Sequence, residues 1–305
     1  MTTATRQAVS DRVMGPENEP LPTRLLGNTG ELVPILGLGT APGGMGLSDE
    51  DAITLYHRAI DEGVTYLDTA PGYGRAHKQL SSVLSERRKE VFLVTKVPAD
   101  DGDKALEMLH EGLRDLGVEQ VDLTFVHSMG NRDLEVVLAK DGSMAALQKA
   151  KASGLTRYVG FTAHNAAWKS VRMLNEADVD AVMLAMNFAD RHTYGFEDKV
   201  LPLATKKNVG VLAMKVYGGA LDMKYEKPER SALSVHGYED HRTALNYALG
   251  LPGVASAVVG VFNDSELMNN IAWAKKHTPV EDASGLLEQG REVAKKLGDH
   301  FGPVD

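Results

Sequence analysis

The unit that decides the fold lies in the stretch Asp103-Lys-Ala-Leu-Glu-Met-Leu-His-Glu-Gly-Leu-Arg-Asp-Leu-Gly-Val-Glu-Gln-Val-Asp-Leu-Thr-Phe-Val-His127. Four leucines recur at helical spacing over residues 103–116, and Gly117 is a typical helix stop. Residues 121–127 then form a mostly apolar run without strict alternation, which is typical of a strand buried on both faces of a parallel sheet. The stretch therefore predicts a helix followed by a strand.

The same alternation of short apolar runs and longer amphipathic runs continues through most of the chain. One helical pattern opens at Ser48 with Asp51 three residues on, which is close to a capping box. Eight strands are expected, at residues 35–39, 65–68, 91–96, 121–127, 158–161, 181–186, 209–215 and 255–260. Helices are expected at residues 48–62, 77–88, 103–116, 142–153, 165–176, 197–208, 240–250, 264–277 and 281–298.

Strand–helix repeats of this kind build either a closed (β/α)8 barrel or a doubly wound open sheet. The even spacing and the number of strands favour the barrel. A dinucleotide-binding open sheet would carry G-x-G-x-x-G after its first strand, whereas Gly37-Leu-Gly-Thr-Ala-Pro42 has proline in the sixth position. We therefore predict an α/β fold, a (β/α)8 TIM barrel with long loops at its mouth.

The N-terminal region precedes these repeats. Residues 1–20 lack an apolar core and a cleavage motif, so we interpret them as a disordered tail rather than a secretory signal. Residues 24–33 place two short apolar runs around Gly27-Asn-Thr-Gly30, a pattern typical of a β-hairpin. The prediction is a disordered tail over residues 1–20 and a single domain over residues 21–305.

The composition excludes several classes of function. The chain has 305 residues, a formal net charge of −9 and no cysteine. No apolar stretch is long enough for a membrane span, and no cluster of Lys and Arg indicates a nucleic acid or an anionic membrane. Thiolate sites are excluded, and no third ligand accompanies His236 and His241, so no metal is expected. We expect a cytoplasmic protein that is a monomer.

Polar residues stand where four of the predicted strands end, at Asp68, Lys96, His127 and Lys215. In a barrel the C-terminal ends of the strands form the mouth that carries the chemistry. Each residue alone is as well explained by a solvated strand end, a cap or a satisfied core group. Four at one rim, with Tyr73 on the loop that follows Asp68, indicate a site.

These side chains suit the reduction of a carbonyl group. Hydride transfer to the carbonyl carbon requires a proton at oxygen, and a tyrosine can supply it although its ordinary pKa is about 10. The ammonium of Lys96 would favour the tyrosinate of Tyr73, and Asp68 would keep Lys96 charged. His127 would orient the substrate oxygen by a hydrogen bond. A glycosidase would need two carboxylates at the mouth, and only Asp68 ends a strand.

Several segments together resemble the aldo-keto reductases, over a span from about Arg24 to about Ala274. The resemblance implies a barrel closed at its bottom by the hairpin, with NAD(P)(H) extended across the mouth. It also implies a catalytic tetrad, with Tyr73 as general acid in reduction, formed by Asp68, Tyr73, Lys96 and His127. The segments that carry it are Leu25-Leu-Gly-Asn-Thr-Gly30, Leu36-Gly-Leu-Gly-Thr40, Gly63-Val-Thr-Tyr-Leu-Asp-Thr-Ala-Pro-Gly-Tyr-Gly74, Val94-Thr-Lys-Val97, Asp122-Leu-Thr-Phe-Val-His127 and Tyr158-Val-Gly-Phe161.

The resemblance further implies where the cofactor lies. His164 and Asn187 would meet the carboxamide, the loop that begins at Lys215 the pyrophosphate, and Asn270 the adenine. Loop capping explains His164 and Asn187 equally well, and the alternative at Lys215 is a plain glycine-rich loop with a surface lysine. The residues expected at the cofactor are Gly39, Thr40, Asp68, Thr162, His164, Asn187, Lys215, Val216, Gly218, Gly219, Gly260, Glu266 and Asn270.

The cofactor preference depends on charge after the eighth strand. Members of the family that prefer NADP place Lys or Arg there, but residues 260–270 contain neither, and Asp264 and Glu266 are acidic. A 2′-phosphate would be repelled there, whereas a free ribose hydroxyl can donate to a carboxylate. The prediction is therefore NAD(H) or NADP(H), with NAD(H) favoured.

The substrate is expected to be a small aldehyde, ketone or matching alcohol. An apolar or aromatic wall at the mouth could hold it. Alternatively, the apolar and aromatic side chains of the mouth loops serve only to pack these loops onto the barrel, which is the structural alternative to a substrate wall. The alternative for the whole protein is a non-catalytic nicotinamide-binding module that senses redox state, which turnover would distinguish. The mouth loops expected, at residues 128–142, 188–196, 216–239 and after 277, carry Met129, Phe188, Tyr194, Phe196, Tyr217, Tyr225 and Tyr238.

Overall fold

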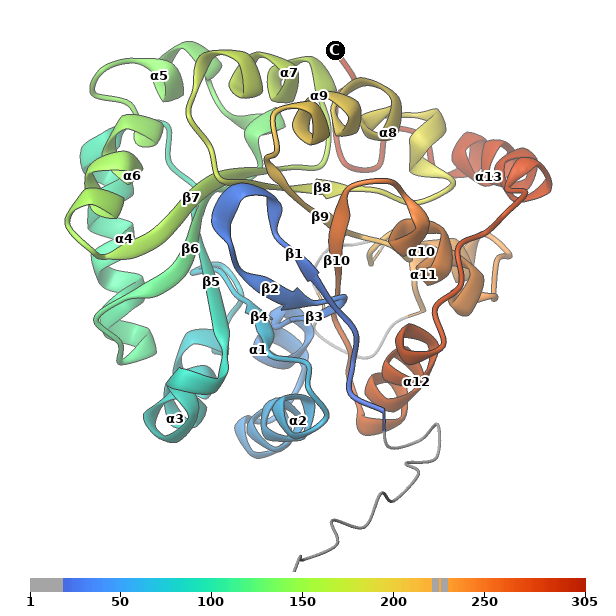
Figure 1. The fold of residues 1–305 in the computed structure, drawn as a ribbon, viewed down its shortest axis with the longest axis horizontal. Coiled ribbons are helices and arrows are strands. Elements are labelled where there is room, and N and C mark those ends of the chain that lie inside the picture. The colour runs from blue at the N-terminus through green and yellow to red at the C-terminus, as the bar shows by residue number, and fades with distance from the viewer. Residues whose placement is uncertain (1–18, 221–224, 226–229) are drawn as a thin grey trace, which may run out of the picture.

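A computed structural model describes residues 19–220, 225 and 230–305 of the chain. Eight parallel strands close into a barrel in the order β10-β3-β4-β5-β6-β7-β8-β9, surrounded by helices (Figure 1). The predicted (β/α)8 barrel is confirmed, and each strand overlaps the run that predicted it. The barrel strands are β3 (Leu36–Gly39), β4 (Tyr66–Asp68), β5 (Phe92–Val97), β6 (Val121–Val126), β7 (Thr156–Ala163), β8 (Ala181–Ala185), β9 (Gly210–Met214) and β10 (Val254–Val259).

The helices begin and end at the signals seen in the sequence. The Ser48 hydroxyl caps α2 by accepting the Asp51 N–H at 3.1 Å, and Gly117 ends α4 in the left-handed region with φ of 68°. The larger helices are α2 (Asp49–Asp61), α3 (Ala76–Arg87), α4 (Gly102–Leu116), α6 (Ser143–Ala152), α7 (Ala167–Glu176), α9 (Leu201–Lys206), α11 (His241–Gly250), α12 (Asp264–Lys275) and α13 (Ser284–Leu297).

Two local predictions were wrong. The helix expected at 197–208 is divided in two because Pro202 cannot donate to the preceding turn. Short helices also lie where loops were expected, and one of them contains a proline and three glycines, so its composition conceals it. The first part of the divided helix is α8 (Phe196–Lys199). The additional helices are α1 (Ala41–Gly46), α5 (Leu134–Leu138) and α10 (Ala232–Val235), with 3-10 turns η2 (Gly27–Thr29), η3 (Arg88–Glu90), η4 (Met129–Asn131) and η5 (Asp190–His192).

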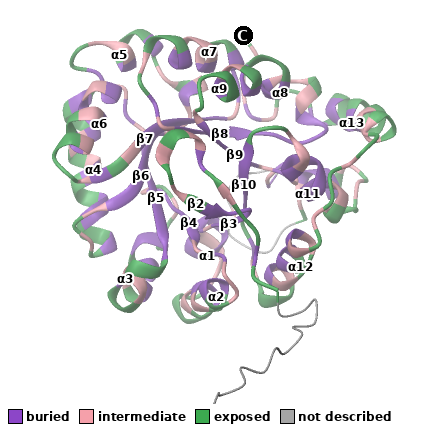
Figure 2. Cartoon of the chain, in the orientation of Figure 1, coloured by how far each residue is buried: buried purple, intermediate pink, exposed green. Residues whose placement is uncertain are grey.

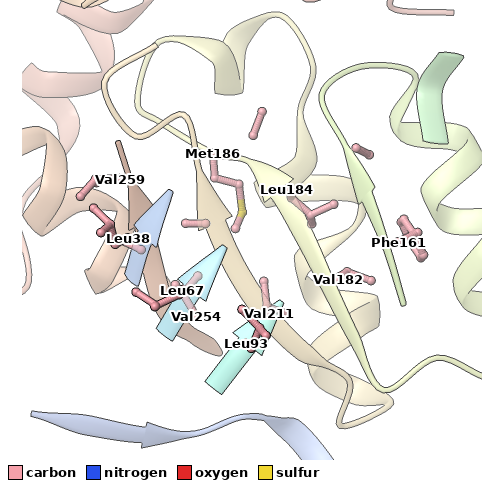
Figure 3. Packing of buried hydrophobic residues seen from close by; sticks show 14 of the residues in the cluster. Leu38, Leu67, Leu93, Phe161, Val182, Leu184, Met186, Val211, Val254 and Val259 are labelled. Atoms are coloured by element: carbon pink, nitrogen blue, oxygen red, sulfur yellow. The ribbon is translucent and has the colours of Figure 1, made fainter. Parts of the chain in front are cut away.

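Apolar side chains form two layers, one inside the barrel and one between the strands and the helices. The inner layer includes Tyr66, Val94 and Phe125, and the outer layer includes their chain neighbours such as Leu67 and Leu93. Figure 2 shows the buried strands inside helices whose outer faces are exposed, and Figure 3 shows part of the outer layer. Both strand faces are buried, which explains the continuous apolar runs in the sequence.

The predicted hairpin is present and lies across the bottom of the barrel (Figure 1). It pairs β1 (Thr23–Leu25) with β2 (Leu32–Pro34) in antiparallel fashion. Leu26 and Val33 belong to the inner apolar layer, so they plug the barrel from below. The prediction of a disordered tail at residues 1–20 falls almost entirely on residues 1–18, which lie outside the described residues. No helix in the described part of the chain is long and apolar enough to cross a bilayer.

Candidate active site

Strand alternation turns three polar side chains toward the barrel axis. Asp68, Lys96 and His127 each follow an inner-layer residue, Tyr66, Val94 and Phe125 respectively, by two positions. Successive side chains on a strand point to opposite faces, so residues two apart share the inner face. The apolar inner layer thus ends in a polar one at the C-terminal ends of β4, β5 and β6.

The four predicted catalytic residues come together there, and we call them the mouth tetrad (Asp68, Tyr73, Lys96 and His127). The Lys96 Nζ lies 2.5 Å from Asp68 Oδ1 and 3.0 Å from the Thr69 carbonyl oxygen. It also lies 3.4 Å from the Tyr73 hydroxyl. The His127 ring meets the Tyr73 ring edge-on at 6.3 Å between centroids. One buried ammonium therefore joins a carboxylate to a phenol.

The surroundings set the charges of the tetrad. Burial opposes the charge on Lys96, but Asp68 and Tyr73 outweigh it and raise the pKa of Lys96 above its ordinary value. Burial, together with the cations Lys96 and Lys215, lowers the pKa of His127 to about 3. At neutral pH the site therefore holds a cationic lysine and a neutral imidazole, which can donate one hydrogen bond.

Two predicted cofactor residues instead brace the tetrad. The Thr40 hydroxyl donates to the Asp68 carbonyl oxygen at 3.0 Å. The Thr162 hydroxyl accepts the backbone N–H of Ser128 at 2.9 Å and so ties down the residue after His127. Both threonines are fully buried, so we interpret them as supports of the strand ends.

The loop that carries Tyr73 depends on close backbone packing. A Cβ on Gly44 of α1 would lie 2.0 Å from the Tyr73 carbonyl oxygen. The Arg75 N–H donates to the Gly44 carbonyl oxygen at 2.9 Å. The glycine-rich segment after β3 therefore serves to seat the Tyr73 loop rather than to cradle a phosphate.

A cavity of about 410 Å³ extends from the mouth tetrad to α12. At one end it is lined by Asp68 and Tyr73, and at the other by Asn270 and Trp273. Among the described residues, no three His, Asp or Glu side chains gather as a metal site would require. The predicted cofactor residues that line the cavity are Gly39, Asp68, Lys215, Val216, Gly219, Gly260, Glu266 and Asn270.

The remaining predicted cofactor residues lie outside the lining. The Asn187 amide donates to Asp190 Oδ2 at 2.6 Å and to the Lys215 carbonyl oxygen at 3.0 Å, and its oxygen accepts two backbone N–H groups. His164 has its Nδ1 3.4 Å from the Ser128 hydroxyl. Gly218, with φ of 78°, packs against α10. The Asn187 contacts are those of a loop cap.

The cavity also has lining residues that the sequence reasoning missed. Glu266, Asn270 and Trp273 lie four and three residues apart along α12, so helical periodicity could have found Trp273. No local signal marks most of the others, which come from α1, from the first residue of α11 and from the segment between β9 and α11 (called the strap, described residues 216–220, 225 and 230–240). They include Pro42, Arg230, Ser231, Ser234, Glu239 and His241.

Several side chains expected at a substrate wall pack inward instead. Met129, Phe188 and Phe196 have no exposed surface. Tyr194 has 1% of its surface exposed, and its hydroxyl accepts the Phe301 N–H at 2.8 Å. The centroid of the Phe301 ring lies 5.7 Å from that of the His164 ring. The last residues of the chain therefore pack beside the mouth, next to His164. Of the remaining predicted aromatics, Tyr217 and Tyr225 line the cavity.

The fold and the mouth residues define the class of (β/α)8-barrel oxidoreductases. The aldo/keto reductase family model matches residues 35–286, and the chain belongs to that family. It is 26% identical to a pyridoxal 4-dehydrogenase of Microbacterium luteolum over 88% of this chain and 97% of that protein. It is 25% identical to a D-threo-aldose 1-dehydrogenase of a Pseudomonas species over 82% of this chain and 92% of that protein.

A solved structure shows the same architecture. An aldo-keto reductase from Pseudomonas aeruginosa is 26% identical, with a TM-score of 0.69 over 86% of this chain and 99% of that chain. Family membership makes this chain an oxidoreductase and supports the use of a nicotinamide cofactor.

Proposed function

We propose that this protein interconverts an aldehyde or ketone and its alcohol, with Tyr73 as the general acid and base. The observation that carries the proposal is the buried ammonium of Lys96, within hydrogen-bond distance of both Asp68 and Tyr73. A phenol beside a fixed cation can release and regain its proton. Such a group is what hydride transfer at a carbonyl carbon requires of the protein.

The mouth cavity suits a nicotinamide cofactor. The Asp68 Oδ2 atom is buried and has no hydrogen-bond partner among the described residues, so it can accept a ribose hydroxyl. Gly39, Gly219 and Gly260 line the cavity and permit a close approach to the backbone. When bound, the nicotinamide supplies or accepts the hydride.

The side chains of the tetrad then have separate tasks. In reduction Tyr73 donates its proton to the substrate oxygen, and in oxidation it takes that proton back. Lys96 stabilises the tyrosinate, and Asp68 stabilises Lys96. His127 is uncharged at neutral pH, so it donates a hydrogen bond to the substrate oxygen without competing as an acid.

We also propose that NAD(H) is the favoured cofactor and that the alcohol is oxidised. Glu266 lines the α12 end of the cavity, and its carboxylate accepts the Phe262 N–H at 2.8 Å and the Asn263 amide at 2.9 Å. This cap holds a negative charge where a 2′-phosphate would lie. Two relatives are named dehydrogenases, one of an aldose and one of pyridoxal, and these names support a small hydroxy-aldehyde as substrate. Its cyclic hemiacetal form carries the hydroxyl that would lose its proton to Tyr73 while the same carbon gives hydride to the cofactor, which leaves a lactone.

The predicted organisation remains part of the proposal. Residues 21–305 would act as one domain, because the hairpin packs on β10 and the last helix packs on the loop after β8. A cytoplasmic location is consistent with a chain without cysteine, and a monomer is consistent with the lack of coiled-coil heptads in the sequence.

Fluorescence titration with NADH and NADPH, followed by turnover with a panel of aldoses and aromatic aldehydes, tests the proposal. We expect binding of NADH in the micromolar range or tighter, weaker binding of NADPH, and oxidation of at least one hydroxy-aldehyde. Binding without turnover of any carbonyl or alcohol would favour the redox-sensing module. Binding of neither cofactor would contradict the proposal.

A further inference from the structure

The α12 end of the mouth cavity carries an ion pair that the proposed chemistry does not use. Arg230 and Glu239, both from the strap, line the cavity and form a salt bridge with each other. The Arg230 guanidinium also donates to the Ser234 carbonyl oxygen at 2.8 Å. Their side chains are 63% and 62% exposed. The pair is therefore open to a ligand in the cavity.

A continuous series of contacts connects this pair to α12. The hydroxyls of Ser231 and Ser234 lie 3.0 and 2.9 Å from His241 Nε2. The His241 ring meets the Tyr217 ring edge-on at 4.9 Å. The Tyr217 hydroxyl donates to Asn270 Oδ1. The pair thus lies on the same wall as the residue expected to contact the adenine.

The charged side chains at this wall include more carboxylates than cations. Among the described lining residues, Lys215 and Arg230 are those with a Lys or Arg charge. Lys215 belongs to the tetrad end, where its charge acts on Asp68. The lining at the α12 end includes the cation Arg230 and the two carboxylates of Glu239 and Glu266, and Arg230 is paired with Glu239. A 2′-phosphate at this end would need the Arg230 guanidinium as its cation, but that guanidinium already forms a salt bridge with Glu239.

We infer that the Arg230–Glu239 pair selects the cofactor, because Glu239 withholds from a 2′-phosphate the cation that Arg230 would otherwise offer. The inference rests on the proposed use of NAD(H) and assigns its selectivity to the strap as well as to Glu266. A ribose without the phosphate needs no cation, so the pair leaves NAD(H) binding unaffected. Loss of the Glu239 charge should release Arg230 for phosphate.

The test is cofactor binding by E239Q, measured by fluorescence titration of NADH and NADPH. We expect E239Q to bind NADPH about three- to tenfold more tightly at low salt, because the pair is exposed and screened. NADH affinity should stay within about twofold. The gain should shrink when the ionic strength rises from about 0.05 to 0.5 M. The double variant E239Q/R230Q should lose the gain.

A matched control comes from α13, where Glu292 and Lys295 form a similarly exposed pair outside the cavity. E292Q should leave both affinities unchanged. An unchanged NADH to NADPH ratio in E239Q, or a gain that persists in the double variant, would overturn the inference. R230Q weakening both cofactors equally would assign Arg230 to the pyrophosphate and overturn it too. If the unaltered protein binds neither cofactor, the proposed function fails as well.

Discussion

The two ends of the barrel are built on opposite principles. At the bottom the hairpin inserts Leu26 and Val33, which have no exposed surface. Its Arg24 guanidinium donates to the carbonyl oxygens of Leu249 and Val254, each at 2.7 Å. At the mouth, Asp68 and Lys96 are buried with charge. At the bottom the Arg24 guanidinium is thus satisfied by two carbonyl oxygens, whereas at the mouth Asp68 Oδ2 has no hydrogen-bond partner among the described residues.

The backbone shows the same contrast. Ser128, Ala166 and Lys215 on the mouth loops have φ of 57°, 47° and 57°, a region that such residues rarely adopt. At the bottom Asn208 also has a positive φ, but asparagine tolerates it. Among the described residues, positive φ at residue types that rarely adopt it therefore gathers at the end proposed for catalysis. Stability and chemistry are therefore expected to respond to different substitutions.

Tyr73→Phe at the mouth should give the largest difference between its effect on activity and its effect on stability. Loss of the proton donor should lower kcat by about 10²- to 10⁴-fold. Cofactor affinity should stay within about threefold, since the hydroxyl is assigned to the substrate, and the free energy of unfolding within about 1 kcal/mol. Steady-state kinetics, cofactor titration and urea unfolding measure the three.

Tyr158→Phe is the matched control at the bottom. The Tyr158 hydroxyl donates to the Thr29 carbonyl oxygen at 2.9 Å. Its removal should cost about 1 kcal/mol of stability and leave kcat unchanged. Activity of Tyr73→Phe within threefold of the unaltered enzyme would contradict the assignment of Tyr73.

Leu26→Ala should have the converse effect. The side chain is fully buried in the inner layer, so its truncation leaves a cavity and should cost about 2–5 kcal/mol of unfolding free energy. The folded fraction should keep kcat/KM within about twofold. Leu32→Ala is the control, because Leu32 is 67% exposed and its loss should cost less than about 0.5 kcal/mol. Similar losses in both variants would show that the hairpin does not plug the barrel.

A pH-dependent gain in stability is expected for Glu197→Gln, in the short helix α8 after β8. Both Glu197 carboxyl oxygens are buried without a partner among the described residues, and burial raises its pKa to about 8. The unfolded chain releases this proton near pH 4.5, so the folded state loses relative stability as the pH rises from there to 8.

The variant should therefore match the unaltered protein at pH 4.5 and exceed it at pH 8, by up to about 2–4 kcal/mol. Urea unfolding across this pH range measures the difference, with the exposed Glu119→Gln as control. A constant difference at all pH values would mean that Glu197 ionises normally in the folded state.

Much of the molecule could be predicted from its sequence. Strand runs, helix faces and caps such as Ser48 are local, so a single chain reveals them. The tetrad was also predictable, because Asp68, Lys96 and His127 are unusual residues at the ends of apolar runs. Short helices such as α1 and α10 were missed, since their composition resembles that of loops and tertiary packing stabilises them.

The residues that line the mouth cavity were less predictable from the sequence. Asn187 and Thr162 have the residue types of cofactor contacts, but their hydrogen bonds go to neighbouring loops. Arg230 and Glu239 stand in the strap, far along the chain from α12, and no spacing rule connects them to it.

The sequence by itself determined the number and order of the strands, the barrel, the family and the residue types at the mouth. These follow from side-chain periodicity and from polar residues where apolar packing ends. Only the tertiary structure decided that Lys96 joins Asp68 to Tyr73, and that the strap brings Arg230 and Glu239 to the cavity wall. Such contacts depend on where barrel closure places segments distant in the chain, which local patterns do not encode.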